Sequence, residues 1–237
     1  MYQIFPCLPR RHLSRRNIGR IKLLLFIIGA FLFIILLTGN SIENDEEWYK
    51  HPNAYFKEVS CEIDEYTQNL NYELTLKLKK TLEQLKLNYF LCYGSLWGVL
   101  KFKSTLPWDR NVDVCIVYHE LVNVNEQVFH QAFKNNELNY FYNTRRGKYV
   151  VFYKTVSAEI TVFEKVGHHM ERVGWEKRLF PHLYYSYQNF PSLLIEPEMD
   201  KLEFNKVLMP VPHQQYELQK YLYPENWWKE IKPKGCF

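Results

Sequence analysis

Acidic and amide side chains alternate in one short stretch of the sequence. Asp109, Asn111 and Asp113 stand two residues apart, and the alternating residues of 112–117 predict a strand that begins among them. Because successive side chains of a strand point to opposite faces, we expect Asn111 and Asp113 to share a face. Glu159, in a later alternating stretch, can supply a further carboxylate from a neighbouring strand. Oxygen ligands of this kind suit Mg²⁺ or Mn²⁺, so the pattern predicts a divalent metal site.

A Gly-Ser turn precedes this stretch and suggests a phosphate site. Gly94 and Ser95 follow a short apolar run at 89–93 and precede an expected helix over 96–101, with Ser95 as its N-cap. The first backbone N–H groups of a helix attract anions, so Gly94 and Ser95 are expected to cradle a phosphate. Lys101 can add positive charge. A plain strand-to-helix connection is the alternative interpretation.

Hydrophobic periodicity predicts the elements that position these residues. Leucines at helical spacing predict an amphipathic helix over 62–87, and short apolar or alternating runs predict strands at 89–93, 112–117, 149–153 and 158–163. Prolines punctuate the remainder, which is expected to form an ordered cap rather than a second domain. The pattern indicates one mixed α/β (α+β) domain.

The N-terminal region predicts a membrane anchor. Residues 21–39 contain one charged residue and form, as a helix, a segment about 28 Å long. A cleaved signal peptide is the alternative. Basic residues precede the segment and acidic residues follow it, which favours a cytosolic N-terminus. We therefore expect a cytosolic tail (1–20), a signal anchor (21–39), a lumenal stem (40–61) and a lumenal domain (62–237), as in single-pass type II proteins of the Golgi or ER membrane.

The charge of the chain is divided unequally. Six basic and no acidic residues precede Ser41, and 24 basic and 26 acidic residues remain after it. The slightly acidic remainder has no dense cationic run, so the sequence argues against nucleic-acid binding.

The five cysteines say little about which of them form disulfides. Cys92 and Cys115 stand in apolar runs and are expected to be buried free thiols, and Cys7 is cytosolic on this topology. Cys61 and Cys236 are left as candidates for a disulfide in an oxidising lumen.

Residues 90–117, FLCYGSLWGVLKFKSTLPWDRNVDVCIV, resemble the LicD/fukutin/fukutin-related family in the Gly-Ser-Leu-x-Gly and Pro-Trp-Asp motifs and the alternating acidic positions. Residues 202–212 and 223–227 are similar to the closing segments of that family. The resemblance implies a nucleotidyltransferase-like fold, with a small mixed sheet flanked by helices. It also implies transfer of a group such as phosphocholine or ribitol phosphate from a CDP-activated donor to a glycan on a glycoprotein, with partner glycosyltransferases.

The resemblance also implies roles for individual residues. Asn111, Asp113 and Glu159 would hold Mg²⁺ or Mn²⁺, and Asp109 or Glu159 would activate an acceptor hydroxyl. The sequence departs from the family pattern where Asn111 replaces an Asp, Lys101 replaces an Arg and Glu159 replaces an Asp. Two hypotheses follow: a metal-dependent phosphotransferase, and a non-catalytic member that binds a glycan or a partner enzyme.

Overall fold

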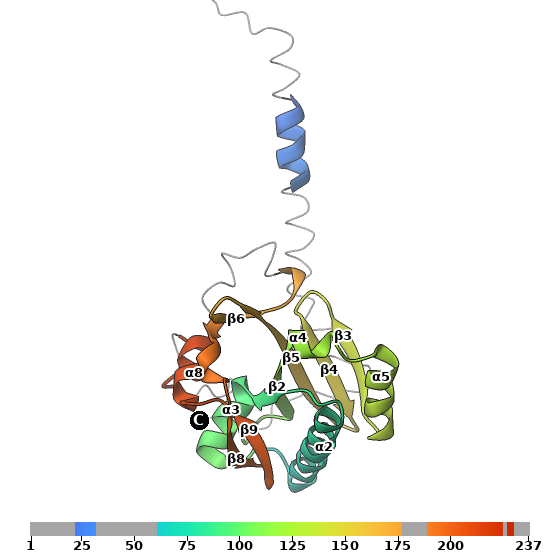
Figure 1. Ribbon diagram of the computed structural model, residues 1–237, viewed down its shortest axis with the longest axis vertical. Coiled ribbons are helices and arrows are strands. Elements are labelled where there is room, and N and C mark those ends of the chain that lie inside the picture. Colours follow the sequence, from blue (N-terminus) through green and yellow to red (C-terminus); the bar gives the residue numbers. More distant parts are fainter. Residues whose placement is uncertain (1–21, 32–60, 177–188, 225–226, 230–237) are drawn as a thin grey trace, which may run out of the picture. The chain divides into compact units, whose positions relative to one another are not determined.

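The computed structural model describes residues 22–31, 61–176, 189–224 and 227–229. The chain divides into two compact units, Met1–Lys57 and Glu58–Phe237. In the first unit, residues 22–31 form a helix, drawn in blue in Figure 1. No helix in these described ranges is both long and apolar enough to cross a membrane. The rest of the expected anchor 21–39 lies outside the described residues, as does the expected stem up to residue 60.

The second unit contains, in chain order, α2 (Glu65–Gln84), β1 (Tyr89–Leu91), α3 (Tyr93–Phe102), β2 (Asn111–Val117), α4 (Tyr118–Leu121), α5 (Glu126–Asn135), β3 (Asn139–Asn143), β4 (Lys148–Tyr153), β5 (Val156–Val166), β6 (His169–Arg172), β7 (Asn189–Pro191), the 3₁₀ helix η1 (Ser192–Leu194), β8 (Asp200–Phe204), β9 (Val207–Val211) and α8 (Gln215–Leu222). Both predicted helices (62–87 and 96–101) and all four predicted strands are present, each with at least one shifted end.

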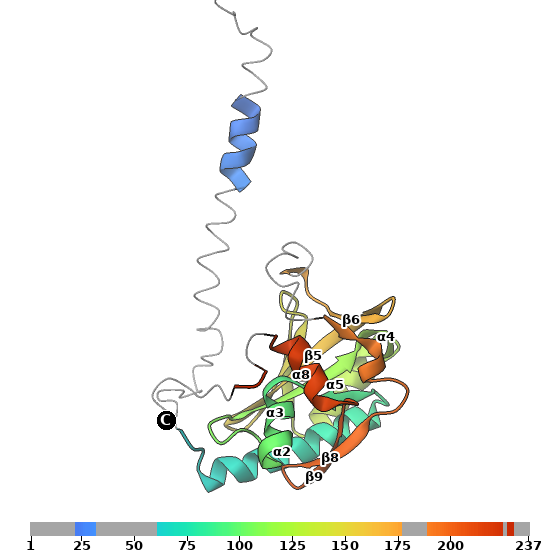
Figure 2. The same cartoon turned by 90° about the vertical axis from the view of Figure 1, so that its left-hand side faces the viewer.

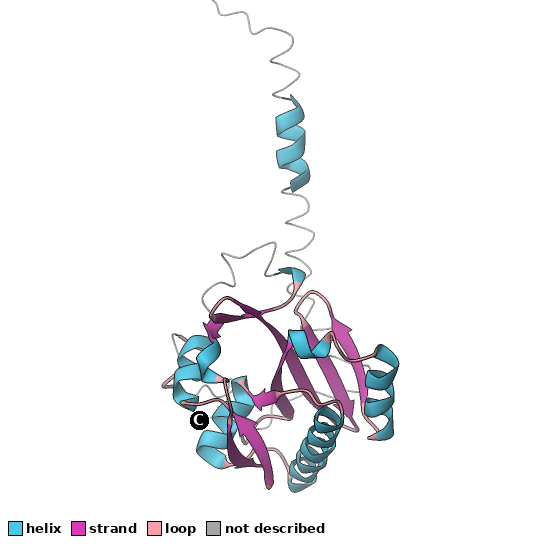
Figure 3. Cartoon of the chain, in the orientation of Figure 1, coloured by secondary structure: helices cyan, strands magenta, loops and turns pink. Residues whose placement is uncertain are grey.

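The centre of the unit is a mixed sheet in the order β1-β2-β5-β4-β3, extended by β6 and β7. β2 and β5 run parallel, and the other pairs are antiparallel. Figures 1 and 3 show helices on both sides of this sheet. This arrangement confirms the expected mixed α/β fold with a mixed sheet flanked by helices.

Helix α2 forms because its leucines make one apolar stripe. Leu70, Leu74, Leu78 and Leu82 are at most 2% exposed, at the spacing of successive helical turns. Asp64 caps the N-terminus, where its Oδ1 accepts from the Thr67 N–H over 2.7 Å. The stripe packs against the sheet and fixes α2 across it.

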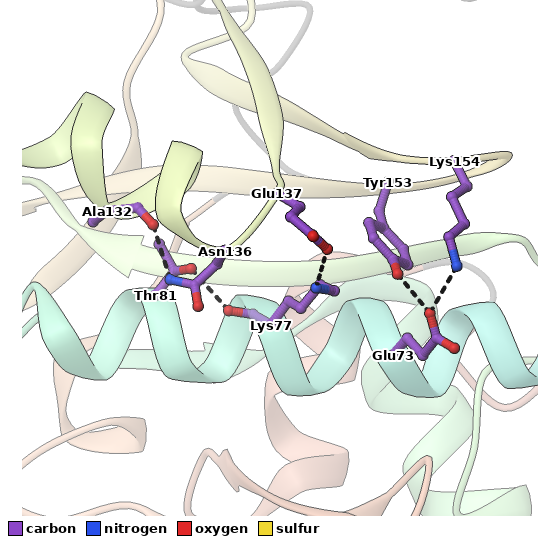
Figure 4. Close-up of polar contacts among 8 residues, drawn as sticks. All are labelled: Glu73, Lys77, Thr81, Ala132, Asn136, Glu137, Tyr153 and Lys154. Carbon is purple, nitrogen blue, oxygen red and sulfur yellow. Dashed lines mark hydrogen bonds and ion pairs between the residues drawn. The ribbon is translucent and has the colours of Figure 1, made fainter.

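Polar contacts hold the other side of α2 to the neighbouring elements (Figure 4). Glu73 Oε2 accepts from the Tyr153 hydroxyl over 2.6 Å and from Lys154 Nζ over 3.1 Å. Lys77 Nζ lies 2.7 Å from Glu137 Oε2. These contacts join α2 to the end of β4 and to the turn that follows α5.

The proline-rich C-terminal region contributes to the same core. Phe204, Met209, Val211 and Leu218 are fully buried within the main hydrophobic cluster. β8 and β9 are joined by a two-residue turn of Asn205 and Lys206, both with positive φ. Within the described residues, this region therefore packs on the sheet and has no separate core.

The expectation of free thiols at Cys92 and Cys115 is wrong, because the two residues form a disulfide with a Cα–Cα distance of 6.0 Å. The cause is the β1–β2 register, which pairs Phe90 with Cys115. Cys92 is two residues beyond Phe90 and so shares the face of Cys115. Cys61 is also disulfide-bonded, and its expected partner, Cys236, lies outside the described residues.

Candidate active site

The parallel pair of strands brings two carboxylates together. Asp113 on β2 is in direct register with Glu159 on β5, so their side chains leave the same face of the sheet. Asp113 is 8% exposed. Glu159 was expected on a neighbouring strand, and the register confirms that placement.

Three hydrogen bonds fix Asp113. The Gly94 N–H donates to Asp113 Oδ2 over 3.0 Å, and Asn111 Nδ2 donates to Asp113 Oδ1 over 2.7 Å. The Asp113 backbone N–H donates to Ser95 Oγ over 2.7 Å. The contact between Asn111 and Asp113 confirms that they share a face. The carboxylate is thereby held in one orientation at the start of α3.

The expected N-cap role of Ser95 is wrong. Helix α3 begins at Tyr93, its N-cap is Cys92, and no side chain caps it. Ser95 is 1% exposed, and its hydroxyl serves the backbone of β2. Gly94 and Ser95 therefore lie beneath Asp113 and support it.

A second carboxylate converges on the same place. Asp109 precedes β2, and its Oδ1 accepts from the Asn111 N–H over 2.9 Å. A Cβ atom on Gly94 would lie 3.0 Å from Asp113 Oδ2 and 3.2 Å from Asp109 Oδ2. The absence of a side chain at Gly94 leaves the space that these two oxygens border.

Both of these carboxyl groups hold protons unusually tightly. The pKa of Asp109 is raised from its ordinary 3.8 to about 6, chiefly by burial; the hydrogen bond from the Asn111 N–H opposes this increase, and the charge of Glu159 contributes to it. Burial also raises the pKa of Asp113 well above 3.8. The charges of Asp109 and Glu159 add to that increase, and Lys148 opposes it. A bound cation would relieve the same repulsion.

Lys148 is a site residue that the sequence analysis missed. Its Nζ lies 2.5 Å from Glu159 Oε2, and the two side chains are 7% and 22% exposed. Lys148 is in register with Thr161 of β5, which places it on the face of Glu159. Lys148 stands one residue before the predicted strand 149–153, and its alternation with the apolar Val150 is the signal that could have extended that strand to include it.

Two tyrosines and an arginine border the carboxylates. The Tyr93 and Tyr223 rings meet edge to face at 6.3 Å, which joins the start of α3 to the residue after α8. Burial raises the pKa of Tyr93 to about 12, with Arg172 lowering it and Asp113 raising it. The Tyr93 hydroxyl is buried and makes no well-formed hydrogen bond to any described atom, although Arg172 lies beside it. Arg172 Nε donates to the Arg146 carbonyl over 2.8 Å.

Lys101 is placed apart from this cluster. It lies about two helical turns after Gly94 on α3. Its ammonium group lies 4.7 Å from the centre of the Trp97 ring. Among the described residues, Lys148 is thus a cation that the structure brings to the carboxylates, and Arg172 lies beside Tyr93.

The residues present fit a divalent cation held by two carboxylates. In the part of the chain that the structure describes, no three His, Cys, Asp or Glu side chains are arranged to hold one metal ion. Asn111 Oδ1 faces Ser157, which donates to it over 3.3 Å, while its nitrogen faces Asp113. Asp109 and Asp113 remain as a pair, and Mg²⁺ is commonly bound by one or two carboxylates with substrate phosphates completing its shell.

A comparison with protein-family models matches residues 86–214 to the family described as LicD/FKTN/FKRP, nucleotidyltransferase domain. The matched segment is more than half of the 237 residues and contains every carboxylate of the site. No curated protein matches the chain.

Proposed function

Because the chain belongs to the LicD/FKTN/FKRP nucleotidyltransferase family, we propose that it transfers a phospho-substituent from a CDP-activated donor to a glycan. The observation that carries the proposal is the convergence of Asp109 Oδ2 and Asp113 Oδ2 over Gly94. Asp109 and Asp113 would hold Mg²⁺ or Mn²⁺ there. When bound, the cation supplies charge neutralisation for the donor's diphosphate.

The neighbouring side chains support the same proposal. Gly94 and Asn111 donate hydrogen bonds to the Asp113 carboxylate, and the Ser95 hydroxyl accepts one from the Asp113 backbone N–H, so the residue is held in place. Arg172 is anchored through Nε, and its remaining N–H groups suit phosphate oxygens in a way that a lysine does not. Glu159, held by Lys148, is positioned to accept the proton of an acceptor hydroxyl.

We extend the proposal to location: a single-pass type II protein with its catalytic domain in the Golgi or ER lumen, where partner glycosyltransferases act. The basic N-terminal tail supports this orientation. The buried Cys92–Cys115 disulfide supports an oxidising compartment. Protease treatment of intact microsomes should remove an N-terminal epitope tag and leave a C-terminal tag protected. The reverse pattern would overturn the proposed topology.

One observation favours a second candidate, a non-catalytic member that binds a glycan or a partner enzyme. Asn111 already gives Asp113 Oδ1 a hydrogen-bond donor, so the carboxylate is partly satisfied without a cation. Such a protein would keep the fold and lose metal-dependent nucleotide binding.

Calorimetry separates the two candidates. The full chain, purified in detergent, is titrated with CDP in the presence of Mg²⁺, Mn²⁺ or EDTA. A transferase should bind CDP only with the metal, and Asp113→Ala should abolish this binding. Glu198→Ala, on the exposed surface, is the control that should behave as wild type. If the wild-type chain shows no metal-dependent CDP binding, the transferase proposal fails.

A further inference from the structure

A cleft of about 420 Å³ lies between three segments that are far apart in sequence. The first part of α2 contributes Gln68, Asn69 and Tyr72, and the end of α3 contributes Phe102 and Lys103. The β8–β9 turn contributes Lys206. Figures 1 and 2 both show the β8–β9 hairpin beside α3 and α2. None of these six residues belongs to the carboxylate site.

The described residues that line the cleft carry a net positive charge. Lys103 and Lys206 both line it, and neither forms an ion pair with any described residue. Glu203 is the acidic residue in the lining, so the balance there is one positive charge. Two exposed ammonium groups at one cleft suit an anionic ligand.

Hydrogen bonds of Asn205 fix the backbone positions of the two lysines relative to each other. Asn205, beside Lys206, donates its backbone N–H to the Lys103 carbonyl over 2.9 Å. Its Oδ1 accepts from the Thr105 N–H over 3.1 Å, and its Nδ2 donates to Thr75 Oγ1 over 3.0 Å. Asn205 is 8% exposed. The hairpin turn is therefore bonded to the segment that follows α3, and the two lysines are presented together.

Both lysines also occupy left-handed backbone positions, with φ of 55° at Lys103 and 61° at Lys206. Glycine is the usual residue at such a helix end and in such a turn. A non-glycine residue is strained at such a φ. Lys86, at the end of α2 and away from the cleft, also has a φ of 55°, so a left-handed lysine does not by itself indicate a binding site. Lys86 is therefore a matched control for variants of Lys103 and Lys206.

The rest of the lining suits a sugar. Tyr72 and Phe102 offer aromatic surface against which the C–H face of a sugar ring can pack. The amides of Gln68 and Asn69 each offer a donor and an acceptor, which match neighbouring hydroxyl groups. Together with the lysines, these groups favour a saccharide that carries an acidic substituent.

The cleft is connected to the carboxylate site. Residues 103–109 run from the cleft to Asp109, and the fully buried Asn71 bridges this segment. Asn71 Nδ2 donates to Thr105 Oγ1 over 3.2 Å and to the Asp109 carbonyl over 3.4 Å. A ligand in the cleft thus contacts the segment that carries Asp109.

We propose that this cleft binds an anionic saccharide, with its ring against Tyr72 and Phe102 and its acidic group at Lys103 and Lys206. Only the identification of this saccharide as part of the acceptor glycan rests on the proposed transferase function. The binding itself does not.

The test measures binding of short oligosaccharides to the full chain in detergent, without donor nucleotide or metal. Four probes of the same backbone end in a neutral sugar or in one that carries a carboxylate, a sulfate or a phosphate. At least one acidic probe should bind tenfold or more tightly than the neutral one, and the tightest identifies the acidic group. Equal binding of all four probes, or no binding of any, would overturn the proposal.

Variants locate the binding. Lys103→Gln and Lys206→Gln should each weaken the acidic probe about tenfold, and Lys86→Gln should not. Lys103→Gly, Lys206→Gly and Lys86→Gly should all raise Tm by about 2–4 °C through relief of the left-handed strain. Only the first two should lose binding. Wild-type affinity in both cleft variants would refute the proposed site.

A last comparison separates this proposal from the transferase. Asp113→Ala should leave binding of the acidic probe intact, because Asp113 does not line the cleft. If the acidic probe binds but CDP does not, the transferase proposal fails and the cleft stands. If the reverse is observed, the cleft proposal fails and the transferase stands.

Discussion

The Gly94 N–H donates to Asp113 Oδ2 over 3.0 Å, and a Cβ atom on Gly94 would lie 3.0 Å from that same oxygen. Gly94 thus supports the carboxylate and leaves open the space beside it. Gly94→Ala would place a methyl group against both Asp113 Oδ2 and Asp109 Oδ2. We expect Mg²⁺ affinity to fall at least tenfold, measured by calorimetry. Without metal, thermal stability should fall slightly, because the two carboxylate oxygens must shift by a few tenths of an ångström to admit the methyl group.

Gly98 provides the contrast for this prediction. A Cβ on Gly98 would lie 2.2 Å from the Ser104 carbonyl oxygen, which is backbone and cannot rotate away. Gly98→Ala should therefore lower Tm. Gly94→Ala with wild-type Mg²⁺ affinity would show that the space above Gly94 holds no cation.

Asn111→Asp should have effects of opposite sign with and without metal. The amide nitrogen of Asn111 lies 2.7 Å from Asp113 Oδ1, so an aspartate there replaces a hydrogen bond by repulsion. In EDTA we expect a loss of about 2 kcal/mol in the free energy of unfolding. With saturating Mg²⁺ the extra anionic ligand should tighten binding and recover the loss.

Thermal denaturation in the two buffers measures this reversal. Asn139→Asp, at an exposed position on the edge strand β3, is the matched control and should show neither effect. A variant that is destabilised equally in EDTA and in Mg²⁺ would contradict a cation at Asp113.

Asp109→Asn should change the pH dependence of stability. The pKa of Asp109 is raised from 3.8 to about 6 by burial and by Glu159, so folding favours the protonated form. That contribution is fully present below pH 3.8 and is lost as the pH rises through about 6. Without metal at pH 7, Asp109→Asn should therefore be more stable than wild type by about 2 kcal/mol, allowing for the partial exposure of the group.

At pH 4 the variant and the wild type should have nearly the same free energy of unfolding. Mg²⁺ should stabilise the wild type more than Asp109→Asn at pH 7. Denaturant unfolding at pH 4, 5, 6 and 7 gives both comparisons, and parallel curves for the two proteins would disprove the strained carboxyl at position 109.

The ion pair of Lys148 and Glu159 should be strongly coupled. Lys148→Met leaves the partly buried Glu159 opposite Asp113 without its cation, which should cost about 3 kcal/mol. Adding Glu159→Gln to Lys148→Met should recover most of that loss. A double-mutant cycle by urea denaturation measures the coupling, and additive effects would show that the pair contributes nothing beyond its members.

Local pattern and long-range register explain what the sequence could predict. The leucine stripe of α2 and the shared face of Asn111 and Asp113 follow from helical and strand periodicity, and the structure contains both. Lys148 comes to Glu159 through the β4–β5 pairing, and Arg172 comes to Tyr93 through β6. Hydrophobic periodicity within one strand does not determine which strands pair or in what register. The Ser95 cap failed for the same reason, because its hydroxyl is used by a strand 18 residues later.

The Cys92–Cys115 disulfide should stabilise both the fold and the site. It closes a segment with a sequence separation of 23, for which loss of the cross-link costs about 3 kcal/mol. Cys92 precedes Tyr93 and Gly94, and Cys115 lies two residues after Asp113. The cross-link therefore holds the start of α3 against β2. The double variant Cys92→Ala/Cys115→Ala should lose about 3 kcal/mol of stability and also bind Mg²⁺ more weakly.

Alkylation of the denatured, unreduced protein followed by mass spectrometry tests the bond directly. Peptides containing Cys92 and Cys115 should carry label only after reduction. Cys7→Ala, outside the domain, is the control that should change neither stability nor Mg²⁺ affinity. Labelling of Cys92 and Cys115 without reduction would contradict the disulfide and remove its support for an oxidising compartment.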